Sequence, residues 1–150
     1  MRQVYNWENN TIHFKDKNEN VFHMQLRGRI TIVTGDSATG KTLLCSRLNS
    51  VKHDRNINAQ RYKADNVFIL NEDNIDKLKS QRNKLIIIDR AEILLDDDMV
   101  LYINEDPGNR YLIFARKPIG IEATPNHFAE MQFVDGEIIL HFEFDVEGWC

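Results

Sequence analysis

Short segments rich in apolar residues recur along the middle of the chain, and polar segments separate them. They lie at residues 29–34, 66–70, 85–88 and 111–115. The four consecutive aliphatic residues at 85–88 are typical of a strand buried on both faces, as in a parallel sheet covered by helices. Helical patterns follow three of the segments, at residues 43–48, 75–82 and 91–95. This alternation predicts an α/β fold with a mainly parallel sheet flanked by helices.

The two ends of the chain have a different pattern. Residues 3–26 alternate between apolar and polar side chains and contain two turn-forming connectors, which predicts an antiparallel meander. Near the C-terminus, apolar segments flank Asp135-Gly136, a dipeptide that strongly favours a β-hairpin. We therefore expect one domain over residues 1–150, with a core at 29–116 and β additions at both ends.

One stretch of eight residues carries a specific chemical signal. Gly35-Asp36-Ser37-Ala38-Thr39-Gly40-Lys41-Thr42 fills every fixed position of the pattern G-x-x-x-x-G-K-[ST]. The glycines let backbone N–H groups wrap a phosphate, and the following helix directs its positive end at the same anion. Lys41 adds charge for the outer phosphates, and the Thr42 hydroxyl coordinates Mg²⁺. The motif predicts a site for ATP or another nucleoside triphosphate with Mg²⁺.

Asp89 is the second candidate for this site. It ends the apolar run at 85–88 and lies 48 residues after Lys41 (89 − 41). A carboxylate at the carboxyl end of a parallel strand reaches the edge where ligands bind in open α/β sheets. We expect Asp89 to orient Mg²⁺ or its water beside Thr42; the alternative is a cap for the helix that starts near Ala91.

The two motifs together resemble the Walker A and Walker B motifs of P-loop NTPases. The intervening strand makes the chain similar to the RecA-like and AAA-type ATPase branch, over residues 29–116 or so. The guanine-reading pattern N-K-x-D of GTPases is not met, because Asn83-Lys84-Leu85-Ile86 lacks the aspartate. The resemblance implies a P-loop NTPase sheet flanked by helices.

The resemblance also implies a glutamate that polarises the attacking water. Arg90 rather than an acid follows Asp89, so two candidates remain: Glu92, three residues further on, and Glu72, beyond the neighbouring strand. Arg116 leaves its strand at the same edge. It either contacts the γ-phosphate or forms a structural ion pair with an acidic neighbour.

These patterns predict magnesium-dependent ATP binding with hydrolysis that serves a switch or an assembly step. Two alternatives stay open: a nucleotide-binding module with little turnover, and a small-molecule phosphotransferase in which Arg90 and Arg116 clamp phosphates. The chain has no recognisable helical lid and no transporter signature sequence. We expect a protein partner or self-association in addition to the nucleotide.

Charge and composition narrow the partners further. The formal net charge is −4, from 19 Lys and Arg against 23 Asp and Glu, so no overall positive field favours nucleic acid or an anionic membrane. No apolar run is long enough to span a membrane, and Cys45 and Cys150 fit a reducing compartment, which predicts a cytoplasmic protein. His13 and His23 have no ligand cluster at metal-binding spacing.

Overall fold

The computed structural model describes residues 2–16, 18–34, 38–53, 62–117, 119–123 and 127–142, and for residues 38–42, 52 and 53 only the backbone. The strands are β1 (Arg2–Gln3), β2 (Tyr5–Asn6), β3 (Thr11–Lys15), β4 (Val21–Gln25), β5 (Ile30–Val33), β6 (Tyr62–Lys63), β7 (Val67–Leu70), β8 (Leu85–Ile88), β9 (Arg110–Phe114), β10 (Phe128–Val134) and β11 (Glu137–Phe142). The helices are α1 (Ala38–His53), the 3₁₀ helix η1 (Ile75–Ser80), α2 (Ala91–Leu94) and α3 (Asp97–Glu105).

The N-terminal strands are amphipathic and antiparallel. In β3 and β4 the buried residues Ile12, Phe14, Phe22 and Met24 alternate with exposed residues, which is the pattern of strands with one face on a core and the other in water. β3 pairs with β2 on one side and with β4 on the other. The rings of Phe14 and Phe22 stack across the β3–β4 pair with centroids 4.7 Å apart.

Four strands in the middle of the chain are parallel neighbours in the order β5-β9-β8-β7. Every residue of β5 and of β8 is buried, as expected for strands covered on both faces. The aliphatic run at 85–88 therefore forms the strand that its sequence predicts.

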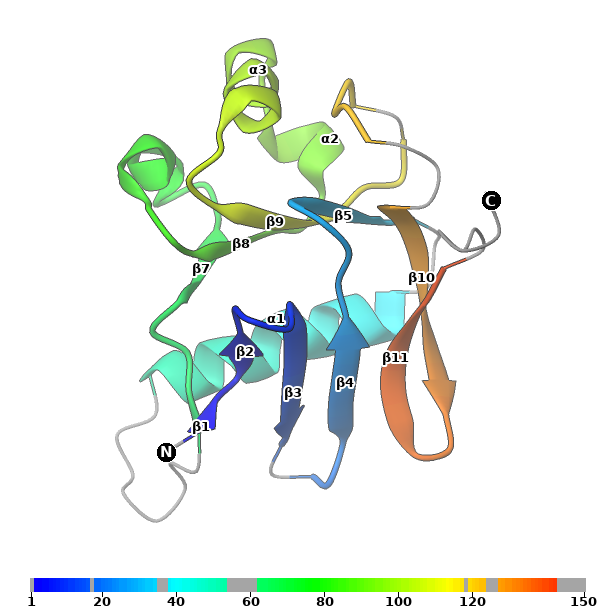
Figure 1. Cartoon of the computed structure of the whole chain (residues 1–150). Helices are drawn as coiled ribbons and strands as arrows, with labels where there is room; N and C mark the ends of the chain where they lie inside the picture. The colour runs from blue at the N-terminus through cyan, green and yellow to red at the C-terminus, as the bar shows by residue number, and fades with distance from the viewer. Residues whose placement is uncertain are drawn as a thin grey trace.

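The antiparallel and parallel strands belong to one sheet. β10 pairs in parallel with β5, and β11 pairs in parallel with β4, so the C-terminal hairpin joins the two groups. The order within the described residues is β2-β3-β4-β11-β10-β5-β9-β8-β7. Just before the edge strands β2 and β7, β1 and β6 pair with each other in parallel, and Asn66 Nδ2 donates to the carbonyl of Tyr5 at 2.8 Å. The nine-stranded mixed sheet is thus nearly closed and barrel-like (Figure 1).

Helix α1 packs against the inner face of this curved sheet. It runs behind β2, β3 and β4 in Figure 1, and its Leu44 and Leu48 are fully buried in the inner hydrophobic core. Arg47 Nε donates to Asp16 Oδ2 at 3.0 Å and so joins α1 to the connection between β3 and β4. The side chain of Asp16 is 3% exposed.

A second hydrophobic core lies on the other face of the parallel strands. The short helices η1, α2 and α3 cover this face with Leu78, Ala91 and Ile103, each of which is buried. Asp96 caps α3 by accepting a hydrogen bond from the backbone N–H of Met99 at 2.8 Å.

The predicted fold class is wrong. The sheet is mixed rather than mainly parallel, its helices are few and mostly short, and the protein is mostly β. The terminal strands are not additions to a P-loop NTPase sheet, because the hairpin stands between β4 and β5 within the single sheet. Local patterns identified individual strands, but the pairing of Ile138 with Phe22 joins residues far apart in the sequence, and no local pattern reports it.

Two local predictions also need correction. The helix expected at residues 75–82 is a 3₁₀ helix, and Asn74 does not cap it with its side chain. Instead, Asn74 Nδ2 donates to the carbonyl of Ile69 at 2.8 Å and steadies the turn after β7. The polar residues 51–65, which by their mixed charge predict a surface connection, include β6, and residues 54–61 lie outside the described residues. Within the described ranges, no helix is long and apolar enough to cross a membrane.

Candidate functional site

The carboxyl ends of β5, β9, β8 and β7 lie side by side along one edge of the sheet. Near these ends Val33 pairs with Phe114, and Ile88 pairs with both Ile113 and Leu70. Because the four strands are parallel, the segment after each of them begins at this same edge. We call it the carboxyl edge.

The phosphate-loop motif, residues 35–42, begins at the carboxyl edge immediately after Thr34. The backbone N–H of Thr34 donates to the carbonyl of Ala129 at 2.9 Å, which joins this position to β10. Helix α1 begins within the motif, so its backbone leaves the edge in helical form. Residues 35–37 and the side chains of residues 38–42 lie outside the description, and the roles predicted for Lys41 and Thr42 stay predictions.

Asp89 follows β8 directly at the same edge and is partly buried. β9 alone separates β8 from β5, so Asp89 lies about 10 Å along the edge from the end of β5, taking the usual spacing of strands. The alternative role as a helix cap fails, because the N-cap of α2 is Arg90, with φ 53° and ψ 51°. Asp89 is thus left at the edge without a capping role.

The structure separates the two glutamate candidates. Arg116 follows β9, and its backbone N–H donates to Glu92 Oε2 at 3.3 Å. The carboxylate of Glu92 therefore lies at the end of β9, one strand from β5. Glu72 is exposed and follows β7, three strands or about 14 Å from β5. Glu92 is the acid nearer to the phosphate-loop motif.

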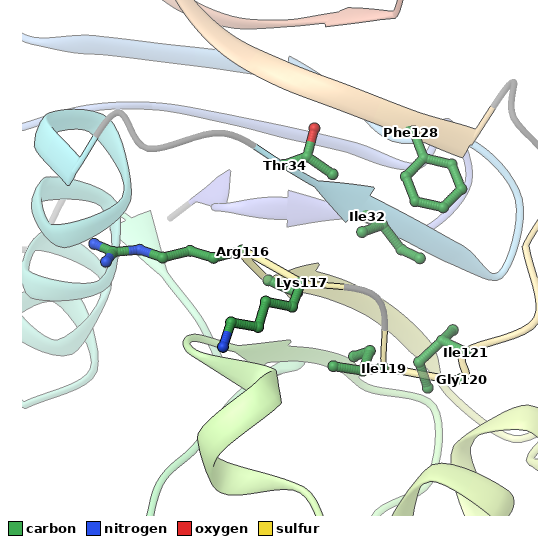
Figure 2. A pocket seen from close by; sticks show the side chains of 9 residues that line it. Ile32, Thr34, Arg116, Lys117, Ile119, Gly120, Ile121 and Phe128 are labelled. Carbon is green, nitrogen blue, oxygen red and sulfur yellow. The ribbon is translucent and has the colours of Figure 1, made fainter.

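Arg116 and Lys117 bring positive charge to the carboxyl edge. Both side chains are exposed, and in Figure 2 the guanidinium of Arg116 extends to the side where α1 begins. Among the ion pairs of the described residues, none involves Arg116. The structural ion pair considered for Arg116 is therefore not formed within that part of the chain. Lys117 was not singled out from the sequence, although its place beside Arg116 was a signal for it.

A pocket of about 190 Å³ opens beside these residues. Its lining is mostly apolar, and Figure 2 shows Phe128, Ile32, Ile119 and Ile121 around it. Thr34 also lines it, so the pocket adjoins the start of the phosphate-loop motif. The lining comes from β5, from the start of β10 and from the segment after β9, and no sequence motif marks it.

The opposite edge of the parallel strands is held by a buried polar network. Arg29 Nη1 donates to the carbonyls of Ile103 (2.6 Å) and Asp106 (2.8 Å), joining the start of β5 to the end of α3. Tyr111, on β9, donates its hydroxyl to Asp106 Oδ2 at 2.5 Å. Burial raises the pKa of Tyr111, as does the hydrogen bond to Asp106, so its hydroxyl stays protonated and keeps donating. This network supports the register of β5 and β9 and thereby the relative positions of residues at the carboxyl edge.

The two histidines of the N-terminal strands lie against each other beside a carboxylate. The rings of His13 and His23 stack with centroids 4.2 Å apart, and His23 Nδ1 lies 3.4 Å from Glu137 Oε2. Burial lowers the pKa of His13, and the neighbouring His23 lowers it further. In the part of the chain that the structure describes, no group of three or more His, Cys, Asp or Glu could hold a metal ion. Such a group would hold the ion by three or more protein ligands. Mg²⁺ that is bound with a nucleotide needs only one or two carboxylates, because phosphates and water supply its other ligands.

No family model matches the chain, and no curated protein matches it.

Proposed function

We propose that the chain binds a nucleoside triphosphate with Mg²⁺ at the carboxyl edge. The observation that carries the proposal is that the motif follows the fully buried strand β5 and continues into α1, which begins at Ala38, with Asp89 two strands away along the same edge. The proposal concerns this site and not the overall fold, which is a mixed sheet.

Each residue has a role set by its chemistry. The backbone N–H groups of residues 35–37 and of the first turn of α1, together with the positive end of that helix, bind the phosphates, and Lys41 neutralises their outer charge. Thr42 and Asp89 hold Mg²⁺, with Asp89 acting through a water molecule because of its distance from β5. Arg116, exposed at the end of the intervening strand β9, supplies further positive charge to the terminal phosphate.

We infer that the same arrangement supports hydrolysis. Glu92 accepts a proton from a water molecule as the water oxygen bonds to the γ-phosphorus, while the bond from that phosphorus to the β–γ bridging oxygen breaks. The products are the nucleoside diphosphate and inorganic phosphate. The hydrogen bond between Glu92 and the Arg116 backbone supports Glu92 over Glu72, since it holds the carboxylate at the end of β9. We propose that turnover serves a switch or assembly step with a protein partner or a second copy of the chain.

Calorimetric binding of MgATP and release of inorganic phosphate test the proposal. We expect Lys41→Ala to weaken MgATP binding by about tenfold or more, since it removes a charge on the phosphates. The matched control is Lys77→Ala, an exposed lysine of η1. Asp89→Asn should lower the dependence of binding on Mg²⁺, and Asp65→Asn, exposed at the opposite edge, should not.

The glutamates are tested by phosphate release at saturating MgATP. Glu92→Gln should keep nucleotide binding and lose about a hundredfold in release, the usual contribution of a general base. Glu72→Gln is the matched comparison and should behave like the native chain. Loss of release in Glu72→Gln but not in Glu92→Gln would overturn the assignment of Glu92. If the native chain binds no nucleotide at millimolar MgATP, the whole proposal is wrong.

A further inference from the structure

The two ends of the pocket beside Thr34 differ in chemistry, as the two ends of a nucleotide do. Its apolar end is formed by Phe128, Ile119 and Ile121, while the cationic side chains of Arg116 and Lys117 lie toward the other end (Figure 2). A ligand that fits this arrangement carries an uncharged ring at one end and anionic groups at the other. We propose that the pocket binds the nucleobase of the nucleotide, an inference that rests on the proposed function.

The volume and lining suit a flat ring. A dry cavity of roughly 150 Å³ holds a benzene ring, and this pocket has about 190 Å³ and is open to solvent on one side. Phe128 is 36% exposed and offers an uncovered aromatic surface for stacking. Ile119 and Ile121 are each partly buried and supply aliphatic contacts to the ring.

The pocket is also continuous with the phosphate site. Thr34 lines it and is bonded directly to the first residue of the phosphate-loop motif. A ring held against Phe128 therefore lies on one side of the end of β5, and phosphates bound at residues 35–42 lie beside it. Arg116 and Lys117 border both regions, since they line the pocket and follow the neighbouring strand β9.

The chemistry of the lining predicts weak discrimination between bases. Among the described residues that line the pocket, Thr34 is the single uncharged polar side chain. Bases are distinguished by hydrogen bonds to their edges, whereas stacking accepts every base because each has a π-face. The pocket should therefore accept adenine and guanine with similar affinity and favour purines over the smaller pyrimidines.

The experiment compares MgATP, MgGTP and magnesium tripolyphosphate, which lacks the base, by calorimetry. In the native chain, both nucleotides should bind about tenfold or more tightly than tripolyphosphate, the usual contribution of a stacked base. Phe128→Ala should lower nucleotide affinity to the level of tripolyphosphate and leave tripolyphosphate binding unchanged. Phe133→Ala is the matched control, since Phe133 lies on the same strand and is 69% exposed.

A second variant, Ile121→Ala, guards against misfolding of Phe128→Ala and should reduce nucleotide affinity in the same direction. If both variants bind MgATP like the native chain while Lys41→Ala does not, the base lies elsewhere and the nucleotide site remains. If MgATP binds more than tenfold better than MgGTP, the predicted selectivity is wrong. If the native chain binds neither tripolyphosphate nor nucleotide, this inference and the proposed function both fail.

Discussion

Tyr111→Phe tests the buried network that holds the amino ends of β5 and β9. The substitution removes a hydroxyl that donates to Asp106 Oδ2 at 2.5 Å and leaves the ring in place, so no cavity forms. Tyr111 is fully buried and Asp106 is 6% exposed, so water cannot replace the lost donor freely. Asp106 keeps its hydrogen bonds from Asn109 Nδ2 and from the Gly108 N–H, both at 2.8 Å. A hydrogen bond to a charged group contributes about 1.5–3 kcal/mol, and we expect the free energy of unfolding to fall by about 2 kcal/mol at pH 7.

The same variant has a defined pH dependence. Burial acts to raise the pKa of Asp106, but hydrogen bonds from Tyr111, Asn109 and Gly108 outweigh it and leave that pKa below its ordinary value. A carboxyl group with a lowered folded pKa stabilises the fold above its unfolded pKa of about 3.9, and this stabilisation is lost as the pH falls through the folded value. The difference between the native chain and Tyr111→Phe should therefore shrink below about pH 3.9.

Urea unfolding followed by far-ultraviolet circular dichroism measures both effects. Tyr102→Phe is the matched control, because the Tyr102 hydroxyl accepts only a long, exposed hydrogen bond of 3.5 Å from Arg82 among its described contacts. That variant should change the free energy of unfolding by less than about 0.5 kcal/mol. A change this small for Tyr111→Phe at pH 7, or a difference that stays constant as the pH falls, would refute the reasoning.

Three further predictions concern other parts of the fold. Asp16→Ala should lower the free energy of unfolding by about 3 kcal/mol in urea titrations, because it removes the ion pair with Arg47 and the hydrogen bonds that order the β3–β4 connection; a loss below about 1 kcal/mol, the size of one surface interaction, would contradict this. Burial, and then the charge of Arg27, lower the pKa of His127 in the folded chain. In the unfolded chain this histidine has its ordinary pKa of about 6.5, so just below that pH the unfolded chain binds more protons than the folded chain and the free energy of unfolding rises with pH. His127→Gln should flatten that part of the stability profile, and an unchanged slope would count against it. Gly136→Ala should cost about 1 kcal/mol in thermal unfolding, because φ is 82° although open space surrounds the position; an unchanged melting temperature would exclude backbone strain.

Parts of the site could be predicted because their signals are local. The motif at residues 35–42, the aliphatic run before Asp89 and the strand before Arg116 are each contained in a few consecutive residues. The choice between Glu72 and Glu92 could not be made in this way. It depends on the lateral order of β7, β8 and β9 and on a hydrogen bond between residues 24 positions apart.

The apolar pocket illustrates the same limit. Phe128 begins β10, and Ile119 and Ile121 belong to an irregular segment with no periodic pattern. They line one cavity because β10 pairs with β5 beside the end of β9. The sequence alone offered no reason to group them.

The sequence by itself determined the central strands β5, β7, β8 and β9, the turn at Asp135-Gly136 and the phosphate-loop motif, because the spacing of apolar residues and the demands of positive φ act within a few residues. The tertiary structure alone decided how the strands join. The parallel pairing of β11 with β4 and of β1 with β6 turns an expected parallel sheet with additions into one nearly closed mixed sheet around α1. Such pairing depends on which distant apolar faces meet. Burial of Phe22, Leu48 and Ile138 in the inner core stabilises that arrangement only once the chain has folded.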